Sequence, residues 1–359
     1  MQSKIILSFL TILAICQQGF ADPNASSKPL SHEVTPYAGP HTTSTVNLYF
    51  TADFLWWKAK QAGMVYATNG VLTQVPTAAQ SFQPLNSGHN GLVNYDWDPG
   101  FKVGAGYKFW HDNWDLYAEY TWLHTDGSDS LERQNGLTPN FPLPEPVAQE
   151  EIANRATSRA HLRFNVIDLE LGRNFYLSPQ LTMRPHFGFK GTWQTQDWRT
   201  RYFSSFLRIQ PNQGNTIPLT GPYRMHHHNR YYGVGIRAGF DTAWHFTYQW
   251  SLFGDIAWTA MWSNYRLRRH DTVDDTTTGQ KRRAINIHTS FYELKYVGEL
   301  QIGLRFETWF ADNSYHFQIQ VGWEEQIWIN HMSYIGTSNP IPYFDLTLHG
   351  LTLMTRFDF

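Results

Sequence analysis

The chain is poor in cysteine, poor in charge, and has no long apolar run after its first residues. Its 359 residues include one cysteine, Cys16, and only 16% are charged, with a formal net charge of −2. One thiol cannot form an internal disulfide, and a near-neutral chain lacks the basic footprint of nucleic-acid binding. Calcium-site and P-loop spacings are absent. After residue 21 no segment approaches the ~18 uninterrupted apolar residues of a transmembrane helix.

Aromatic residues are abundant instead. They make up 16% of the chain and include 15 Trp, although the mean hydropathy is only −0.45. Trp and Tyr concentrate where one end of a side chain is apolar and the other is wet, as at a membrane interface. The length suits either two soluble domains or one large barrel.

The first 21 residues have the pattern of a secretory signal peptide. Lys4 supplies the positive region, residues 5–15 the apolar region, and Gly19-Phe20-Ala21 the small residues before a cleavage site. We expect cleavage after Ala21, which also removes Cys16 from the mature protein. Residues 22–45 are rich in Ser, Thr and Pro and predict a flexible periplasmic leader, and residues 46–359 carry the patterned part of the chain.

That part alternates apolar and polar residues with the period of two that is typical of β-strands. The clearest segment runs from Glu293 to Glu307, with all of its charges on one face. The last segment, Gly350–Phe359, places Phe357 and Phe359 on its apolar face. This aromatic end resembles the C-terminal signal that the barrel-assembly machinery reads. Residues 160–176 change the phase of their alternation near Val166 and Ile167, which predicts a β-bulge there.

Short turns alternate with long polar connections along the chain, an asymmetry typical of outer-membrane barrels. Aromatic residues flank both kinds of connection and predict two girdles. The expected turn-side residues are Trp110, Trp114, Phe175, Tyr176, Trp244, Trp250, Trp309 and Tyr315, and the expected loop-side residues are Trp57, Trp97, Trp122, Trp193, Trp262 and Trp323. The fold class is therefore an all-β, antiparallel transmembrane β-barrel of about ten strands, with up to sixteen left open. Its ends meet when Asn47–Lys58 pairs with the C-terminal strand, because a sheet in a bilayer must close.

Several strand motifs resemble a known family. They are Phe54-Leu55-Trp56-Trp57-Lys58, Asp168-Leu169-Glu170-Leu171-Gly172-Arg173, Arg184-Pro185-His186-Phe187-Gly188, and the Gly350–Phe359 terminus. The chain is similar to the Legionella-type and chlamydia-like major outer membrane proteins, a group described as pore-forming. The resemblance implies a porin-like barrel in the envelope of a host-associated Gram-negative-type bacterium. Disulfide cross-linked relatives are cysteine-rich, whereas this mature chain has no thiol for such cross-links.

Charged side chains on the polar faces are the candidate pore-lining residues, which would set an ion preference in a wet channel. They are Asp53, Lys102, Lys108, Asp115, Glu119, Asp168, Glu170, Arg184, His186, Lys190, Arg237, Asp241, Asp255, Glu293, Lys295, Glu299, Arg305 and Glu307. In a narrow barrel the same charges would instead pair and fill the lumen. An open pore and a plugged lumen are both kept as alternatives.

Three further sets of residues are weaker candidates for a functional site. His226-His227-His228 cannot all point at one metal ion on an extended chain, so no metal site is expected. A basic cluster, Arg266, Arg268, Arg269, Lys281, Arg282 and Arg283, could hold lipopolysaccharide phosphates or a host polyanion, but its opposite charges near Asp271–Asp275 favour a solvated hairpin. His124, Asp126, Asp129 and His270-Asp271 are available to a rim protease, but no nucleophile motif accompanies them.

The sequence therefore predicts an outer-membrane porin-like channel for small hydrophilic solutes and ions, with no cofactor and no catalytic residue. A structural or adhesive barrel with a plugged lumen and host-contacting loops is the first alternative, and a loop-rim protease is the second. The expected partners are outer-membrane lipids, lipopolysaccharide and the barrel-assembly machinery. A homo-oligomer and a host surface are left open, and no nucleic acid is expected.

Overall fold

A computed structural model describes residues 38–40, 42, 47–72, 85–109, 113–140, 153–203, 207–209, 217–219, 222–274, 280–335 and 343–359. The predicted signal peptide lies outside these residues, as does most of the predicted leader. Within the described ranges the regular structure is entirely β-strand. No helix in this part of the chain is long and apolar enough to cross a membrane.

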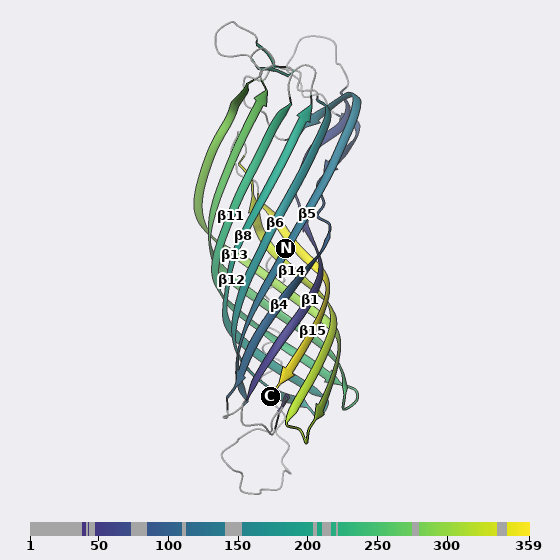
Figure 1. The fold of residues 1–359 in the computed structure, drawn as a ribbon, viewed down its shortest axis with the longest axis vertical. Coiled ribbons are helices and arrows are strands. Elements are labelled where there is room, and N and C mark those ends of the chain that lie inside the picture. Colours follow the sequence, from purple (N-terminus) through teal and green to yellow (C-terminus); the bar gives the residue numbers. More distant parts are fainter. Residues whose placement is uncertain are drawn as a thin grey trace. The chain divides into compact units, whose positions relative to one another are not determined.

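Ten long strands pair antiparallel with their neighbours in the chain and close into a barrel. They are β1 (Leu48–Gln61), β4 (Trp97–Lys108), β5 (Trp114–Pro139), β6 (Ala153–Arg173), β8 (Leu181–Phe203), β11 (Tyr223–His245), β12 (Trp250–Asp274), β13 (Lys281–Phe310), β14 (Tyr315–Ser333) and β15 (Tyr343–Asp358). In Figure 1 the strands are steeply tilted, and the C-terminus lies at the lower end, where short turns join β11 to β12 and β13 to β14. This confirms the predicted fold class and the count of ten.

The shorter strands lie outside this ring of ten. β2 (Val65–Leu72) and β3 (Leu85–Leu92) form a hairpin in the first long connection, and β2 also pairs with the end of β5. β7 (Phe175–Ser178) pairs with the start of β8, and β9 (Leu207–Ile209) pairs only with β10 (Ile217–Leu219). The strands within the long connections, β2, β3, β9 and β10, therefore add no spanning strand to the ten.

The two ends of the barrel meet as the sequence predicts. β1 pairs with β15 from Tyr49 opposite Asp358 to Gln61 opposite Leu346. The Phe359 amide continues the ladder by donating to the Leu48 carbonyl at 2.9 Å. Closure leaves the barrel without a free strand edge, which a bilayer requires because it offers no water to unpaired backbone groups.

Outward aromatic side chains form a ring near the loop end of the membrane-facing wall. We call this the loop-side aromatic ring; it comprises Trp56, Trp97, Trp193, Tyr232, Trp262, Tyr292 and Trp323. Two predicted girdle residues are wrong. Trp57 is 0% exposed and points into the barrel, so Trp56, 42% exposed, takes its place in the ring. Trp309 lines the interior near the turns instead of facing outward. Trp110 lies outside the described residues.

The apolar and the polar face of the wall change sides at this ring. Between the ring and the turns, the outward face is apolar and the inward face is charged, as in β11 with Val234 and Ile236 outward and Arg237 inward. Beyond the ring the inward face becomes apolar and the outward face polar, as in β8 with Trp198 buried and Arg199 exposed. The register of β8 against β6 and β11 continues through this change without a shift.

This exchange explains why the predicted bulge at Val166 and Ile167 is wrong. β6 pairs with β5 and β8 in unbroken register through both residues. Phe164 and Val166 are buried inside the barrel, while Ile167 and Leu169 face outward toward lipid. The apolar residues change face because the surroundings change, and the backbone keeps its regular alternation.

Closure between β1 and β15 can be tested by cross-linking in a chain that lacks Cys16. Ala52 and Thr355 are directly opposite in the register, so Ala52→Cys with Thr355→Cys should react with a short bismaleimide and change the migration of the denatured chain. Ala52→Cys with Ala260→Cys on β12 is the control, and it should not cross-link within one chain. Equal cross-linking of both pairs would contradict the strand order.

Candidate functional site: a charged vestibule below an aromatic plug

The turn-side half of the barrel contains a cavity of about 780 Å³, which we call the vestibule. Turn residues such as Gln180, Thr247 and Asn313 line one end of it, and wall residues such as Thr121 and Gln326 line the other. The inward faces of the strands are polar here because the outward faces must be apolar against lipid. The vestibule therefore opens toward the short-turn end and penetrates the membrane-facing part of the barrel.

Basic and acidic side chains pair across the vestibule. Arg184 contacts Asp115 at 2.6 Å and Asp241 at 2.7 Å. Lys190 contacts Asp168 at 2.8 Å and Glu299 at 2.7 Å. The two groups join through further contacts, because Glu170 pairs with both Arg184 and Arg237, and Arg237 also pairs with Glu299. Such pairing offsets the cost of removing these charges from water.

A further ion pair lies in the lining of the vestibule, between β4 and β14. Lys102 on β4 contacts Glu324 on β14 at 2.8 Å and lies 3.7 Å from Glu119. Its Nζ atom is also 5.3 Å from the centre of the Trp57 ring, a cation–π distance. Lys102 thus connects the charged interior with the apolar residues above it.

Carboxylates exceed cations in the vestibule lining by nine to five. The carboxylates are Asp53, Glu119, Asp168, Glu170, Asp241, Asp255, Glu299, Glu307 and Glu324, and the cations are Lys102, Arg184, Arg237, Arg305 and Arg356. Asp53 and Asp255 each keep one buried oxygen without a hydrogen-bond partner in the described structure. With all nine carboxylates ionised, the lining of the vestibule would carry a negative excess, which attracts cations.

Most of the predicted pore-lining residues reach this cavity. Those that line the vestibule are Asp53, Lys102, Glu119, Asp168, Glu170, Arg184, His186, Arg237, Asp241, Asp255, Glu299, Arg305 and Glu307. Lys108 and Asp115 line a smaller cavity of about 50 Å³ near the turns. Lys190 is buried beneath its ion pairs, and Lys295 pairs with Glu293 at 2.9 Å outside both cavities. The prediction missed Glu324 and Arg356, which belong to the same alternating inward faces.

Above the vestibule the lumen is filled by apolar side chains, which we call the plug. Its buried members include Leu55, Trp57, Phe164, Trp198, Tyr231, Met261, Tyr265, Trp328, Tyr334 and Leu348. Phe164 on β6 and Trp328 on β14 come from opposite walls of the barrel, yet their ring centres are 5.3 Å apart. Tyr231 contacts Tyr265 at 4.9 Å. The contact between Phe164 and Trp328 therefore joins opposite walls across the lumen, whereas Tyr231 and Tyr265 are paired on the neighbouring strands β11 and β12.

Polar side chains within the plug also form hydrogen bonds between strands that are not neighbours in the barrel. Gln196 on β8 donates to Tyr95 Oη at 2.8 Å and also to Gln61 on β1. His331 on β14 hydrogen-bonds Gln194 on β8 at 2.9 Å and packs 4.1 Å from the Tyr231 ring centre. Buried polar groups that find partners hold opposite walls in one arrangement.

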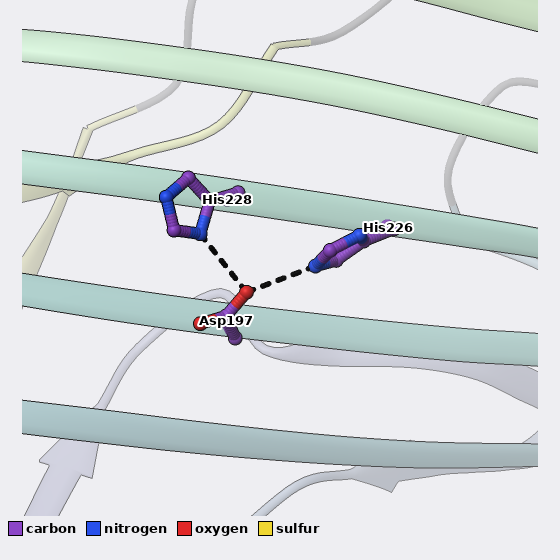
Figure 2. A group of neighbouring side chains, drawn as sticks. All are labelled: Asp197, His226 and His228. Carbon is purple, nitrogen blue, oxygen red and sulfur yellow. Dashed lines mark hydrogen bonds and ion pairs between the residues drawn. The ribbon is translucent and has the colours of Figure 1, made fainter.

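A cluster of two histidines and one aspartate lies on the outer surface beyond the aromatic ring (Figure 2). Alternation along β11 turns His226 and His228 outward and buries His227. Asp197 on β8 lies between the two, with its Oδ1 atom 2.9 Å from His226 Nε2 and 3.0 Å from His228 Nδ1. Hydrogen bonds from His226 and His228 hold the pKa of Asp197 well below its usual range.

These three ligand atoms lie within 4.8 Å of one another, and imidazole and carboxylate are donor types that zinc accepts. Two arginines oppose a bound cation, however. Arg230 Nε donates to His228 Nε2 at 3.1 Å, and Arg199 Nε lies 3.4 Å from His226 Nε2. The arrangement favours a balanced charge cluster over a metal site, and the absence of a metal stays a prediction.

The residues available to a rim protease do not converge. His124 and Asp126 meet His161 on the outer face of β5 and β6. Asp129 instead accepts a hydrogen bond from Tyr66 at 3.1 Å. His270 is exposed, whereas its neighbour Asp271 is buried against Arg269 and Tyr223.

The closed antiparallel barrel, apolar outside and charged inside between its turns and its aromatic ring, defines an outer-membrane β-barrel protein. The chain belongs to the family described as the Legionella pneumophila major outer membrane protein precursor, whose match covers residues 40–359. This confirms the predicted family and the outer-membrane localisation. No curated protein sequence matches the chain.

Solved outer-membrane barrels resemble the fold at low identity. The outer membrane protease OmpT from Escherichia coli is 11% identical, with coverage of 91% of this chain and 99% of that one and a TM-score of 0.39. The CymD monoaromatic hydrocarbon channel is 11% identical, covers 88% and 89%, and has a TM-score of 0.30. A Pseudomonas aeruginosa FadL homologue is 10% identical, covers 87% and 89%, and has a TM-score of 0.21.

The buried histidine of the plug should make stability depend on pH. Burial, together with the Lys295 charge, lowers the pKa of His331 to about 3, against about 6.5 in an unfolded chain. The neutral ring therefore favours the fold, so its contribution is complete above about pH 6.5 and is lost as the pH falls toward 3. The free energy of unfolding should fall by up to roughly 1.4 kcal/mol per pH unit from this group.

Urea unfolding between pH 4 and pH 7 measures this slope. His331→Gln should reduce it, whereas His270→Gln on the exposed outer surface should leave it unchanged. An equal slope in wild type and His331→Gln would mean that the His331 ring does not report burial in the plug.

Proposed function

We propose that the protein is a structural outer-membrane barrel whose lumen is closed and whose wall carries the long connections away from the membrane. The contact between Phe164 and Trp328 from opposite walls supports closure most directly. The strand lengths support the raised wall, because β12 has 25 residues and β13 has 30, whereas ~9–11 residues span a bilayer.

A planar bilayer tests closure. The wild-type barrel should give no reproducible conductance steps, because the plug leaves no water-filled path. Phe164→Ala with Trp328→Ala removes both contacting rings and should produce such steps. Each substitution should also lower stability by about 3–5 kcal/mol, so folding must be checked by circular dichroism.

Trp262→Ala is the matched control, since it removes an equally large ring from the outer face. It should fold and remain silent in the bilayer. Steps in the wild type as frequent as those in the double variant would overturn the closed barrel and favour a channel.

A diffusion channel is the second candidate, and the vestibule is the observation that favours it. A polar cavity of about 780 Å³ is more than a sealed structural barrel needs. Conduction would then require the plug to move, and the excess of carboxylates would favour cations over anions.

In this second case Lys102→Gln should increase cation preference, since it removes the cation nearest the plug. The reversal potential in a salt gradient measures that preference. Lys60→Gln on the outer surface is the control and should have no effect. An unchanged reversal potential in Lys102→Gln would place Lys102 outside any conducting path.

We further propose that the protein is not an enzyme. His124, Asp126, Asp129 and His270 face different surroundings, which leaves a rim protease without an assembled site. Incubation with a peptide library should therefore yield no cleavage products. Cleavage that is lost in Asp126→Asn would contradict this proposal.

A further inference from the structure

Seven exposed arginines gather on one outer face of the barrel beyond the loop-side aromatic ring. We call them the arginine field; they are Arg159 and Arg163 on β6, Arg199 and Arg201 on β8, Arg230 on β11, and Arg266 and Arg268 on β12. These four strands are consecutive in the sheet. The field is therefore a continuous surface and not a set of scattered charges.

The arginines of the field oppose one another in the register. Arg159 lies directly across from Arg199, and Arg230 lies directly across from Arg266. Like charges at directly opposite positions of an antiparallel pair destabilise the sheet. The field thus carries an energetic cost in the isolated protein, which a bound anion would relieve.

Carboxylates do not balance the field within the described part of the chain. None of the seven arginines forms an ion pair there. The outward acids nearby have other partners, because Asp197 lies between two histidines, Asp126 pairs with His161 and Asp274 pairs with Arg224. Four of the arginines use their Nε atoms in neutral or histidine contacts: Arg163 donates to His161, Arg199 to His226, Arg230 to His228 and Arg266 to Asn264. These contacts engage one edge of each guanidinium, and the terminal amino groups can still donate to a ligand from outside.

The position of the field identifies the kind of ligand. In β11, Arg230 precedes Tyr232 of the aromatic ring by two residues, or about 7 Å along a strand. Arg266 also lies over the Tyr232 ring at 5.7 Å. Below Tyr232 the same strand exposes Val234 and Ile236, which suit acyl chains. A ligand on this surface would have an apolar part below the ring and an anionic part immediately above it.

We propose that the arginine field binds the phosphate groups of a phosphorylated glycolipid in the outer leaflet, that is, of lipopolysaccharide. Arginine suits this role because its planar guanidinium can donate two parallel hydrogen bonds to one phosphate. The phosphates lie between the opposed arginines and separate their charges. The basic cluster of the sequence contributes Arg266 and Arg268 to this surface, whereas Arg269 is buried and pairs with Asp271.

The test measures lipopolysaccharide binding to the full barrel, refolded in zwitterionic detergent. A quadruple variant, Arg159→Gln, Arg199→Gln, Arg230→Gln and Arg266→Gln, removes both opposed pairs. Its affinity should be at least about tenfold lower, since each cation near an anionic headgroup contributes to binding. Lys58→Gln with Lys60→Gln removes two outward cations of β1 as the control and should bind like wild type.

Two further measurements separate phosphate recognition from a general effect on folding. Enzymatically dephosphorylated lipopolysaccharide should bind the wild type at least about tenfold more weakly than the intact lipid. Without lipid, the quadruple variant should melt close to wild type, because relief of the repulsion offsets the loss of the exposed hydrogen bonds that Arg199, Arg230 and Arg266 donate. The two double variants, one for each opposed pair, repeat the binding test if the quadruple variant does not fold.

Wild-type affinity in the quadruple variant, or in both double variants, would overturn the proposal. So would equal binding of intact and dephosphorylated lipid, which would assign the interaction to the acyl chains alone. Tighter binding of a free polyanion such as heparin than of lipopolysaccharide would assign the field to a soluble partner and would also overturn it.

Discussion

The structure depends on one constraint, which is that a continuous hydrogen-bonded wall must pass from lipid into water. The ladder between β8 and β11 runs from Tyr202 to Leu181 without a shift in register. Because alternate side chains keep pointing to opposite faces, the wall can meet two surroundings only by changing which face is apolar. The vestibule lies where the outside is apolar, and the plug lies where the outside is polar. Both follow from the same alternation.

Below the aromatic ring the barrel is polar inside and apolar outside, the reverse of a soluble protein. Above the ring it has an apolar core like that of a soluble protein. The ion pairs of Arg184, Arg237 and Lys190 stabilise the lower interior, where removal of either partner would leave a buried charge unpaired. Aromatic packing holds the upper interior, where burial of apolar surface from water drives association. Lys102 lies at the boundary, with Glu324 on one side and Trp57 on the other.

Alternation in the sequence was enough to predict the wall, its ten strands, its closure between β1 and β15, and the inward faces of most charged residues. It was not enough at the boundary. The apolar residues around Val166 change face, and sequence alone cannot distinguish a change of surroundings from a bulge. Trp57 was misplaced for a related reason, since adjacent Trp56 and Trp57 suit either face of a strand at the interface.

Contacts across the lumen could not be predicted from the sequence either. Alternation assigns Phe164 and Trp328 to inward faces, but their contact depends on barrel radius and stagger, which no local pattern contains. The pairing of Asp197 with His226 and His228 depends on the register between β8 and β11. The prediction that three consecutive histidines cannot share one ion was sound, but it overlooked the aspartate on the neighbouring strand.

The C-terminal residue Phe359 makes its contacts with neighbouring strands only when the barrel is closed. In the closed barrel the Phe359 amide donates to Leu48 and its carbonyl oxygen accepts from Thr42 Oγ1 at 2.9 Å. Its ring packs against Phe357 at 4.8 Å and Phe50 at 5.9 Å. If assembly machinery recognises this terminus as an unpaired strand, then completing the barrel removes the recognition element. On that condition a closed barrel no longer presents the element, and closure itself would mark the end of assembly.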